Sequence, residues 1–459
     1  MKNPLTRRLA ALKRRLPPGE LDLSEPIRQG HAGDKWFATR VPDAVALPRS
    51  PESVAKIARF ACDHKIPLTA RGAGYGYVGG CVPVRGGIVL SLAGLDRIHE
   101  INTADFVAVV GPGVNTLKLQ TEVEKVGLYY PPDPASRADC SIGGNIATNA
   151  GGPRCLKYGV TREYVLGLQV VLADGSIVRL GSRTHKNKTG FDLTKLFIGS
   201  EGMLGIITEA TLKLLPLPPF RACLGVGFAS MKLAARAIRA VFASGILPSA
   251  LELADTFTLA AAQKRTGSKL LGGCGAHLII ELDGQESSVR GEIKDLRGLL
   301  RGQEPLFVQS GFGTEGCERF WKLRREFSYA LRDTGLTKLN EDVVVPRGRL
   351  EDLFDLAARL HVKHRLPIAC FGHAGDGNIH VNVMLDETNP GARRRSEAAL
   401  DDLFKHVLAW GGVITGEHGI GLAKKKWWPQ AAPPEVRALH RVIKDALDPV
   451  GILNPGKFV

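Results

Sequence analysis

The hydrophobic and polar positions of the chain follow two different periods, which predicts a protein built from both helices and strands. The stretch from Ser50 to His64 opens with serine, proline and glutamate and then places apolar residues at helical spacing, so we expect a helix there. Short apolar runs over residues 66–70 and 88–92 predict two strands, with a glycine-rich connection between them.

Further apolar runs predict a hairpin and, later, an alternation of strands with helices. Residues 166–172 and 177–180 flank an Asp-Gly turn, and residues 199–216 form a glycine turn that leads into a strand. The proline-rich LPLPPF at residues 215–220 is the best candidate for a linker. Beyond it we expect strands over 276–282 and 343–345 and helices over 231–242, 286–301, 320–332 and 396–410.

The connection at residues 71–80, RGAGYGYVGG, contains the dinucleotide-binding pattern GxGxxG at Gly74, Gly76 and Gly79. A Rossmann unit needs a helix directly after this loop, whereas here the chain continues as GCVPVRGG into another strand, so we reject a Rossmann fold. Two interpretations remain. The N–H groups of the loop surround a pyrophosphate, or the loop is only a tight connection between two strands.

A second glycine-rich stretch, PPDPASRADCSIGGNIATNAGG at residues 131–152, holds two Gly-Gly pairs. Its side-chain amides at Asn145 and Asn149 add hydrogen-bonding groups. We expect a long irregular loop here, and such loops in compact domains are usually functional.

The length of 459 residues exceeds what one hydrophobic core comfortably serves, so we expect two or three domains. The formal net charge of +15 favours an anionic partner, which is a nucleic acid, an acidic lipid, an acidic protein or a carboxylate substrate. No zinc-finger, homeodomain or aromatic RNA-binding pattern accompanies the basic residues, so we do not expect nucleic-acid binding.

Basic residues concentrate near the N-terminus, where leucines recur at helical spacing. This pattern fits a helix on a lipid surface, a docking site for a partner, a transit peptide or an ordinary surface helix with solvated charges. There is no run of about 18 apolar residues and no secretory signal, so we expect no transmembrane helix and a retained N-terminus. The leucines are Leu5, Leu9, Leu12 and Leu16, and the basic residues are Arg7, Arg8, Lys13, Arg14 and Arg15.

The eight cysteines are widely spaced, and none forms a CxxC pair. We therefore expect reduced, mostly buried thiols and no iron–sulfur cluster on this chain, because such a cluster needs closely spaced thiolates. Reduced thiols fit a cytoplasmic protein, with or without membrane association, or a mitochondrial matrix protein if the source is eukaryotic.

The motif GHAGDGNIH places His373 and His380 on either side of a glycine turn, so a hairpin would bring their imidazoles face to face. Asn382 lies two residues further along, on the same strand face as His380, and Glu417 in TGEHGIG offers a third ligand. Two histidines and a carboxylate suit zinc, manganese or iron with an open coordination position. A lone histidine is more often structural, but three candidates in two glycine-rich loops favour a metal site.

Six motifs follow one another along the chain: RGAGYGYVGG, PPDPASRADCSIGGNIATNAGGPRCLKYG, GSEGMLGIITEATL, GHAGDGNIHVNV, GEHGIG and DPVGILNPGK. Together, over residues 40–459, they resemble the FAD-linked oxidases of the vanillyl-alcohol oxidase superfamily, whose FAD-binding domain is of the PCMH type. The branch is that of D-lactate dehydrogenase, the FAD subunit of glycolate oxidase and D-2-hydroxyglutarate dehydrogenase.

The resemblance implies an α+β fold, with a PCMH-type FAD-binding domain of two α+β subdomains and a cap domain with an antiparallel sheet and flanking helices. The expected segments are a basic N-terminal segment over 1–40, the FAD-binding domain over 41–218, the cap domain over 219–410 and a C-terminal segment over 411–459 that returns to the FAD-binding domain.

The resemblance also implies FAD held without a covalent bond, because the glycine loop has Tyr75 where some relatives attach the flavin to a histidine. Tyr75 and Tyr77 are bulkier than the residues of the usual GTGLSGG, and they stack near the flavin or pack against a neighbour. The implied FAD contacts come from both glycine-rich stretches and two distant positions: Arg71, Gly72, Ala73, Gly74, Tyr75, Gly76, Gly79, Gly80, Pro131, Asp133, Ser136, Gly143, Gly144, Asn145, Thr148, Gly152, Ile207 and Asn454.

The implied activity is oxidation of a small D-2-hydroxy acid, of the D-lactate, glycolate or D-2-hydroxyglutarate kind, to the 2-oxo acid. His373, His380 and Glu417 match the metal ligands of the family, and His418 matches its catalytic base. In this mechanism the metal stabilises the substrate alkoxide, the base takes the hydroxyl proton and the C2 hydrogen leaves as hydride to flavin N5.

A cation must bind the substrate carboxylate. Arg324 in FWKLRREF occupies the matching helix position, with the adjacent Arg325 as an alternative and Lys338 as a second candidate. For each of these cations the other interpretation is a solvated surface position. Asn382 completes the implied catalytic set.

Two other functions stay open: a metal-dependent hydrolase with Glu417 as the base, and a binding or sensor protein that keeps the fold without catalysis. The hydrolase leaves the glycine-rich first half unexplained. A flavin enzyme of this sequence needs a separate electron acceptor, which is an iron–sulfur subunit, a cytochrome, an electron-transfer flavoprotein or a quinone. The acceptor, the particular acid and the oligomeric state do not follow from the sequence.

Overall fold

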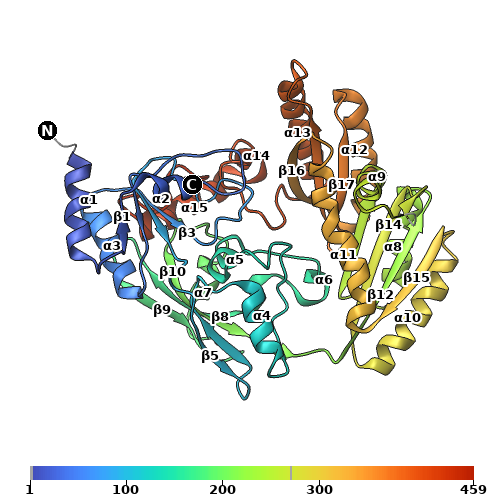
Figure 1. Ribbon diagram of the computed structural model, residues 1–459, viewed down its shortest axis with the longest axis horizontal. Helices are drawn as coiled ribbons and strands as arrows, with labels where there is room; N and C mark the ends of the chain where they lie inside the picture. The colour runs from blue at the N-terminus through green and yellow to red at the C-terminus, as the bar shows by residue number, and fades with distance from the viewer. Residues whose placement is uncertain (1–3, 269–270) are drawn as a thin grey trace. The chain divides into compact units, whose positions relative to one another are not determined.

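The computed structural model describes residues 4–268 and 271–459, which divide into two compact units. Unit 1 takes the described residues up to Gly151, then Val160–Leu217 and Glu417–Val459. Unit 2 takes Gly152–Gly159 and Pro218–Gly416. The N-terminal and C-terminal segments therefore both belong to unit 1 (Figure 1).

Unit 1 is built around two β-sheets. One has four strands in the order β1-β2-β4-β3, in which β2, β4 and β3 run parallel. The other has five antiparallel strands in the order β5-β6-β10-β8-β9, and β7 pairs separately with β11. The strands are β1 Leu21–Asp22, β2 Ala44–Ala46, β3 Leu68–Arg71, β4 Ile88–Ser91, β5 Ile98–Asn102, β6 Val107–Val110, β7 Leu128–Tyr129, β8 Val165–Val171, β9 Ile177–Gly181, β10 Ile206–Lys213 and β11 Leu215–Pro216.

The helices of unit 1 are mostly short. The predicted helix after Ser50 is confirmed as α3, and its cap is the Ser50 Oγ, which accepts a hydrogen bond from the Ser53 N–H at 3.2 Å. The helices are α1 Pro4–Arg15, α2 Glu25–Gly30, α3 Pro51–Asp63, α4 Thr116–Glu124, α5 Ile142–Thr148, η1 Thr161–Tyr164, α7 Leu193–Phe197, α14 Trp428–Ala431 and α15 Pro434–Leu447.

Unit 2 contains a seven-stranded sheet in the order β15-β12-β14-β13-β17-β18-β16, in which each neighbouring pair is antiparallel. Its strands are β12 Phe220–Phe228, β13 Ala250–Asp255, β14 Ala276–Gly284, β15 Phe307–Phe312, β16 Thr337–Val344, β17 Ile368–His373 and β18 Asn378–Leu385. Its helices are α6 Cys155–Tyr158, α8 Met231–Ala243, α9 Thr256–Thr266, α10 Glu286–Arg301, α11 Gly313–Arg332, η3 Arg347–Arg349, α12 Leu350–His364 and α13 Ala392–Ala409.

Several sequence predictions are confirmed. The hairpin forms as β8 and β9, and the helix predicted over 286–301 is α10 with the same bounds. Residues 72–87, all described, form no helix between β3 and β4, which agrees with the rejection of a Rossmann unit. The strands near 66–70 and 88–92 are β3 and β4, and they pair in parallel.

The expectation of an irregular loop over 131–152 is wrong in part, because residues 142–148 form α5. Ser141 caps the helix through its Oγ, which accepts a hydrogen bond from the Gly144 N–H at 3.4 Å. The Gly-Gly pair hides the helix in the sequence, since glycine lowers helix propensity. Here the glycines have a packing reason, because a Cβ on Gly143 would lie 2.5 Å from the Cβ of Pro112.

Three element boundaries also differ from the predictions. Helix α11 begins at Gly313 rather than at residue 320, and α13 begins at Ala392 rather than at residue 396. The early turns of both helices lack the apolar period because they are rich in glycine or arginine. Strand β16 covers Thr337–Val344 instead of 343–345, since its first half is polar.

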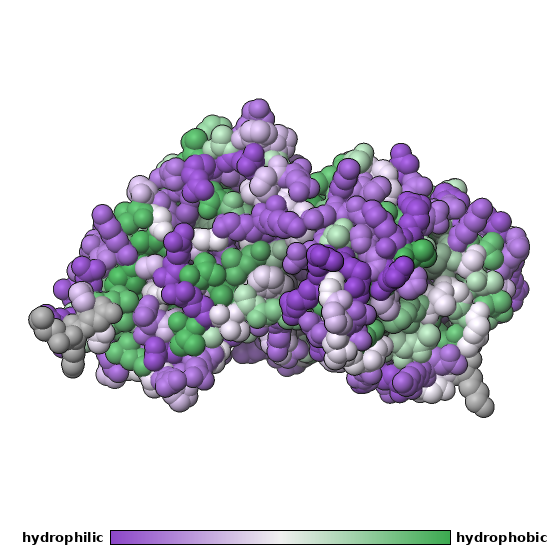
Figure 2. Space-filling view, turned by 90° about the horizontal axis from the view of Figure 1, so that it is seen from above, coloured by the Kyte–Doolittle hydropathy of each residue, from purple (hydrophilic) through white to green (hydrophobic). Residues whose placement is uncertain are grey.

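The N-terminal leucine pattern forms α1, and its apolar side faces the interior of unit 1. Leu9 and Leu12 are 3% and 1% exposed and belong to the same core cluster as Leu16 and the buried residues of α3. The structure therefore contradicts membrane contact through these leucines and supports an ordinary surface helix. None of the helices formed by the described residues combines the length and apolar content needed to cross a membrane. In Figure 2, hydrophilic residues cover much of the visible surface, with apolar residues between them.

Replacing Leu12 by alanine should destabilise unit 1 by about 2–4 kcal/mol, because it leaves a cavity in a closed core. Thermal and urea unfolding followed by circular dichroism would measure the change. The matched control is Arg14→Ala in the same helix, whose side chain is exposed and whose loss should leave unfolding nearly unchanged. Equal behaviour of the two variants would contradict the burial of the helix.

Candidate active site

One face of the unit 2 sheet brings together most of the predicted catalytic and metal-binding side chains. Residues directly opposite each other in antiparallel strands point to the same face. His373 on β17 stands opposite Glu252 on β13, and Asn382 on β18 stands opposite Asn340 on β16. His380 stands opposite Phe371, not opposite His373. The two predicted histidines are therefore diagonal neighbours on a single face.

The imidazoles of His373 and His380 are both buried, and their ring centroids lie 5.7 Å apart. The rings meet edge to face, with an interplanar angle of 79°, rather than face to face as the motif suggests. The difference follows from the register, because His373 ends β17 while His380 is the third residue of β18. The hairpin prediction is otherwise confirmed.

Glu252 connects His373 to Arg324. Its Oε1 lies 2.5 Å from the His373 Nδ1, and its Oε2 accepts a hydrogen bond from the Arg324 Nε at 2.6 Å. Burial acts to raise the pKa of Glu252, but the charges and hydrogen bonds of His373 and Arg324 outweigh burial and lower the pKa to about 2. The carboxylate therefore stays ionised and fixes which nitrogen of His373 points away from it.

Arg324 rather than Arg325 faces this site. The Arg324 side chain is 11% exposed and its guanidinium lies 4.8 Å from the ring centroid of Phe371, whereas the Arg325 side chain pairs with Glu318 at the surface. The solvated-surface interpretation therefore applies to Arg325 and not to Arg324.

Lys338 and Asn382 lie on the same sheet face as the histidines. The Lys338 Nζ donates to the Ser328 Oγ at 2.7 Å, and burial, with smaller effects of Arg332 and Arg324, lowers the pKa of the lysine to about 8. The Asn382 side chain is fully buried and donates to the carbonyl oxygens of His380 and Ala369. Its Oδ1 is buried without a hydrogen-bond partner among the described residues, so it can accept a hydrogen bond from a ligand.

Glu417 directly follows Gly416, which is the last residue of unit 2. The Gly416 N–H donates to the carboxylate of Asp342 on β16 at 2.8 Å, and a Cβ on Gly416 would overlap the side chain of Asn378. Within unit 2, the neighbouring imidazoles of His373 and His380, one of them bound to the Glu252 carboxylate, fit a divalent metal by their chemistry. Glu417, the third predicted ligand, is the first residue of the last stretch of unit 1.

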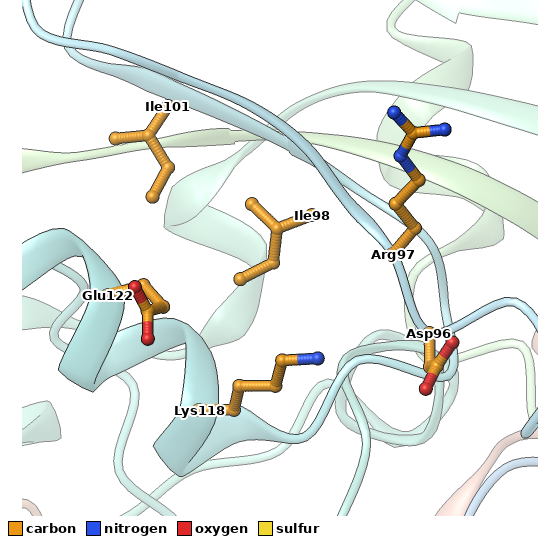
Figure 3. A pocket seen from close by; sticks show the side chains of 6 residues that line it. All are labelled: Asp96, Arg97, Ile98, Ile101, Lys118 and Glu122. Carbon is orange, nitrogen blue, oxygen red and sulfur yellow. The ribbon is translucent and has the colours of Figure 1, made fainter.

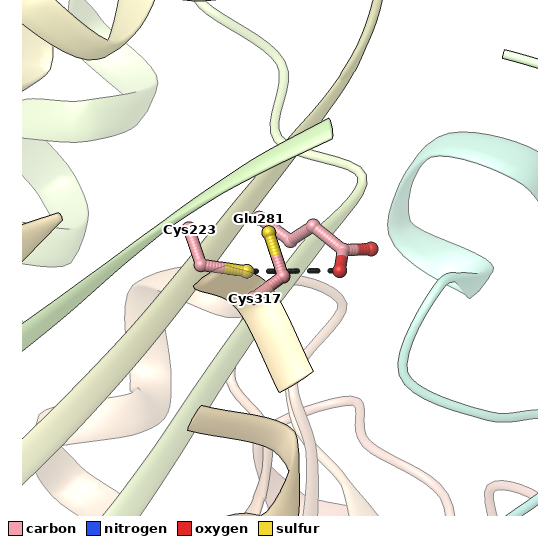
Figure 4. Close-up of side chains that lie close together, drawn as sticks. All are labelled: Cys223, Glu281 and Cys317. Carbon is pink, nitrogen blue, oxygen red and sulfur yellow. Dashed lines mark hydrogen bonds between the residues drawn. The ribbon is translucent and has the colours of Figure 1, made fainter. Parts of the chain in front are cut away.

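A second cluster of possible ligands, not predicted from the sequence, lies in unit 2. It consists of Cys223, Glu281 and Cys317 (Figure 4). Arg154 donates to both Glu281 oxygens, at 2.7 and 3.1 Å, and Trp321 donates its Nε1–H at 2.6 Å. These donors occupy and neutralise the carboxylate, so we assign the cluster a structural role. All eight cysteines are free thiols, as expected.

The glycine loop of unit 1 packs against the start of α5. A Cβ on Gly72 would lie 2.6 Å from the Ser141 Oγ, and a Cβ on Gly74 would overlap the guanidinium of Arg71. Arg71 donates to the carbonyl oxygen of Gly33 at 2.8 Å, so this arginine helps to shape the loop. The close approaches explain why these positions hold glycine.

The other predicted FAD contacts fall mainly around the same loop. Asn145 on α5 is buried and donates to the Thr116 Oγ1 at 2.8 Å, while Asp133 is buried in the irregular stretch before the helix. Asn454 donates to the carbonyl oxygen of Gly80 at 2.9 Å, which ties the C-terminal segment to the glycine loop. Ile207 lies on β10, and Gly152 falls in unit 2 rather than in unit 1.

The two tyrosines of the loop both contact other residues. The Lys35 Nζ lies 4.6 Å from the ring centroid of Tyr75, and the ring of Tyr77 lies 5.5 Å from that of His418 at an angle of 35°. His418 is thus placed beside the glycine loop within unit 1.

A separate hollow of about 590 Å³ opens beside α4 and β5 (Figure 3), lined by Asp96, Arg97, Ile98, Ile101, Lys118 and Glu122. Its lining contains none of the candidate residues and mixes both charge signs with two isoleucines. We assign it no role.

Two family models match the chain. The FAD binding domain matches residues 42–181, and the C-terminal domain of FAD linked oxidases matches residues 217–458, which is more than half of the chain. The chain belongs to the FAD-linked oxidases. It is therefore an FAD-dependent oxidoreductase, and the flavin-free hydrolase loses its support.

Relatives of this FAD-linked oxidase align over nearly its full length. The glycolate oxidase subunit GlcD of Bacillus subtilis is 38% identical over 91% of this chain and 89% of the relative. The D-lactate dehydrogenase of Anaerostipes hadrus is 32% identical over 99% of this chain and 98% of the relative. Among solved structures, the 4-ethylphenol oxidase of Gulosibacter chungangensis matches with a TM-score of 0.81 at 20% identity, covering 99% and 96% of the two chains. That likeness shows the fold, which is α+β with a PCMH-type FAD-binding domain.

The residues of unit 1 fit the cofactor of an FAD-linked oxidase. The glycine-rich loop over 71–80 offers backbone N–H groups of the kind that surround a pyrophosphate. The Oδ1 of Asn454, which is tied to this loop, is buried without a hydrogen-bond partner among the described residues. The sequence gives no sign of the role of Glu252, which lies 121 positions from His373 and meets it only through strand register. Glu201 was not among the predicted site residues either, although it lies inside the GSEG motif.

Glu252→Gln in this FAD-linked oxidase should lower the free energy of unfolding at pH 7 by about 3 kcal/mol, because it leaves a buried guanidinium without its anion. The folded-state pKa of about 2 lies below the usual 4.5, so the carboxylate stabilises the fold above about pH 4.5 and loses this effect as pH falls towards 2. Urea unfolding between pH 7 and pH 2.5 should show the wild type and the variant converging. The control Glu318→Gln, at the exposed partner of Arg325, should cause a much smaller loss. A difference that persists at pH 2.5 would argue against the ion pair.

Proposed function

We propose that this FAD-linked oxidase oxidises a small D-2-hydroxy acid to the 2-oxo acid, with His418 as the base and a divalent metal beside it. The observation that carries the proposal is the buried pair of imidazoles, His373 and His380, one of them oriented by a carboxylate that also binds Arg324. Relatives named glycolate oxidase subunit GlcD and D-lactate dehydrogenase support a hydroxy acid as the substrate.

The metal ligands in this proposal are His373, His380 and Glu417. A bound zinc, manganese or iron ion supplies a Lewis acid for the hydroxyl oxygen of the substrate. The Glu252 carboxylate holds His373 with one ring nitrogen turned towards the ligand set. Both histidines are buried, and a metal ligand must be the neutral imidazole.

His418 accepts the proton of the substrate hydroxyl in this proposal. It follows Glu417 in the chain, and its ring packs against Tyr77 of the glycine loop. FAD, when bound without a covalent link in unit 1, supplies the acceptor for the hydride from C2 of the acid. A histidine suits the proton transfer because its ordinary pKa lies close to neutrality.

Arg324, Lys338 and Asn382 orient the acid in this proposal. Lys338 and Asn382 lie on the sheet face that carries the histidines, and Arg324 reaches Glu252 of that face from α11. Arg324 uses its Nε on Glu252, which leaves the outer nitrogens of its fork for a carboxylate. The reduced pKa of Lys338 reflects the cost of burying a cation beside other cations, and an anionic substrate offsets that cost.

Electrons leave the reduced enzyme through a separate acceptor, which is an iron–sulfur subunit, a cytochrome, an electron-transfer flavoprotein or a quinone. The free, dispersed cysteines support this proposal, because they offer no cluster-binding set of thiolates among the described residues. We propose a cytoplasmic location, or the matrix in a eukaryote, on the same ground.

Anaerobic addition of D-lactate, glycolate or D-2-hydroxyglutarate to the FAD-loaded protein should bleach its visible absorbance, and at least one L-acid should fail to do so. His418→Ala should slow bleaching by about 10²–10⁴-fold and leave FAD bound, because only proton transfer is lost. Stopped-flow absorbance and the flavin-to-protein ratio measure the two quantities. A colourless protein that cannot be reconstituted, or a flavoprotein that no acid bleaches, would contradict the activity, and the second result would favour a binding protein.

His380→Ala, or treatment with a strong chelator, should remove the metal and abolish bleaching while FAD stays bound, because the predicted FAD contacts lie elsewhere. Elemental analysis and absorbance measure metal and flavin separately. His380 is a cleaner target than His373, which also binds Glu252. The exposed His440 on α15 provides the control His440→Ala, which should retain metal and turnover. Full turnover of metal-free protein would remove the metal from the mechanism.

A further inference from the structure

Glu201 is a buried carboxylate at the centre of the loops that surround His418. It is 8% exposed and lies in the turn before β10 with a left-handed φ of +49°, a conformation that non-glycine residues rarely adopt. Its Oε1 accepts a hydrogen bond from the Ile420 N–H at 2.7 Å, and its Oε2 accepts one from the Gly421 N–H at 2.9 Å. Strain at such a position persists only where several contacts hold it.

The backbone of Glu201 is fixed to two parts of the predicted FAD site. Its N–H donates to the carbonyl oxygen of Ala147 in α5 at 2.8 Å, and its carbonyl oxygen accepts a hydrogen bond from the Asn454 Nδ2 at 2.7 Å. The same amide of Asn454 donates to the carbonyl oxygen of Gly80 in the glycine loop at 2.9 Å. One residue thus connects α5, the glycine loop and the segment that carries His418, all within unit 1.

The segment that carries His418 needs such an anchor. Gly419 and Gly421 have left-handed φ values of +88° and +50°, so the backbone after the histidine adopts a conformation that other residues rarely take. A Cβ on Gly419 would lie 2.7 Å from the Glu201 Oε1, so the carboxylate lies directly against the residue next to the histidine. Two hydrogen bonds to successive N–H groups fix both the position and the direction of this backbone.

A carboxylate meets this task better than the amide of the same shape. Each of its oxygens accepts one N–H, whereas a glutamine side chain has one acceptor oxygen and would turn an NH₂ donor towards the second N–H. Burial raises the pKa of Glu201 to about 7, with the two backbone hydrogen bonds, Lys457 and Lys424 opposing the shift. Above a pH of about 7 the site therefore bears the cost of a buried anion, which a purely space-filling role does not require.

We propose that Glu201 is a positioning residue for catalysis, which holds the backbone after His418 so that the imidazole stands at a fixed place beside the glycine loop. The inference rests on the proposed role of His418 as the base. It adds a residue that contacts neither the acid nor the metal ligands and acts only through the loop over 419–421.

The test is a double-mutant cycle on the FAD-loaded, metal-loaded enzyme with Glu201→Gln and His418→Ala. The probe is whichever of D-lactate, glycolate and D-2-hydroxyglutarate bleaches the wild type fastest, and rates are expressed per bound flavin. Glu201→Gln alone should lower the limiting bleaching rate by about 10- to 100-fold, because a small displacement of a catalytic group has that effect. Its half-saturating acid concentration should stay within about twofold of the wild type, since loss of transition-state contacts alone leaves this value unchanged.

The same substitution in the His418→Ala background should change the rate by less than about twofold, because residues that act through one another are not additive. Glu201→Asp, which keeps the charge but shortens the arm, should fall between the wild type and Glu201→Gln. The control Glu209→Gln changes a glutamate on β10 that pairs at the surface with Arg179, and it should behave as the wild type.

Different results separate the two proposals. An unimpaired His418→Ala enzyme, or a wild type that no acid bleaches, overturns the proposed function. If His418→Ala is impaired, two results overturn the positioning role alone. One is an unimpaired Glu201→Gln enzyme, and the other is a loss of rate on Glu201→Gln that is equally large with and without His418. If Glu201→Gln does not load flavin, Glu201→Asp takes its place in the cycle, and failure of both to load flavin assigns Glu201 to folding instead.

Discussion

The buried carboxylate of Glu252 is the interaction on which the polar face of the unit 2 sheet depends. The Arg324 guanidinium lies against Phe327 and Phe371, and burying it without an anion would cost several kcal/mol in desolvation. Glu252 lies between this guanidinium and an imidazole and gives each a charge-assisted hydrogen bond, with one oxygen for His373 and the other for Arg324. The three groups can therefore be buried together, and the position of each one determines the orientation of the next.

Unit 1 uses a buried carboxylate differently. Glu201 accepts hydrogen bonds from backbone N–H groups, whereas Glu252 accepts them from charged side chains. The pKa shifts therefore have opposite signs: the pKa is raised to about 7 in Glu201 and lowered to about 2 in Glu252. A full positive charge within hydrogen-bond distance overcomes burial, whereas two peptide dipoles do not. The two carboxylates therefore differ in function as well. Glu252 orients the side chains of His373 and Arg324, and Glu201 binds the backbone N–H groups of residues 420 and 421.

The sequence predicts those parts of the fold and site that depend on local spacing. The helix over 286–301, the hairpin β8–β9 and the neighbouring histidines of GHAGDGNIH all follow from periods of a few residues. The carboxylate that binds His373 does not follow from local spacing. The position of Glu252 depends on the antiparallel register of β13 and β17, whose residues lie more than a hundred positions apart. Glu201 lies inside a motif that carries the family resemblance, yet nothing near it in the sequence says that its carboxylate reaches residues 420 and 421.

Two of the wrong predictions, those for β16 and α5, arise where a segment does not follow the regular apolar pattern of a segment that lines a core. Strand β16 reads TKLNEDVV, and its alternate residues Lys338, Asn340 and Asp342 face the histidines, so polar groups replace the apolar half of the usual period. Helix α5 carries a Gly-Gly pair because its backbone lies close to neighbouring residues, and this weakens the very signal by which a helix is found. In β16 and α5, local propensity and observed structure therefore disagree at segments that carry predicted site residues.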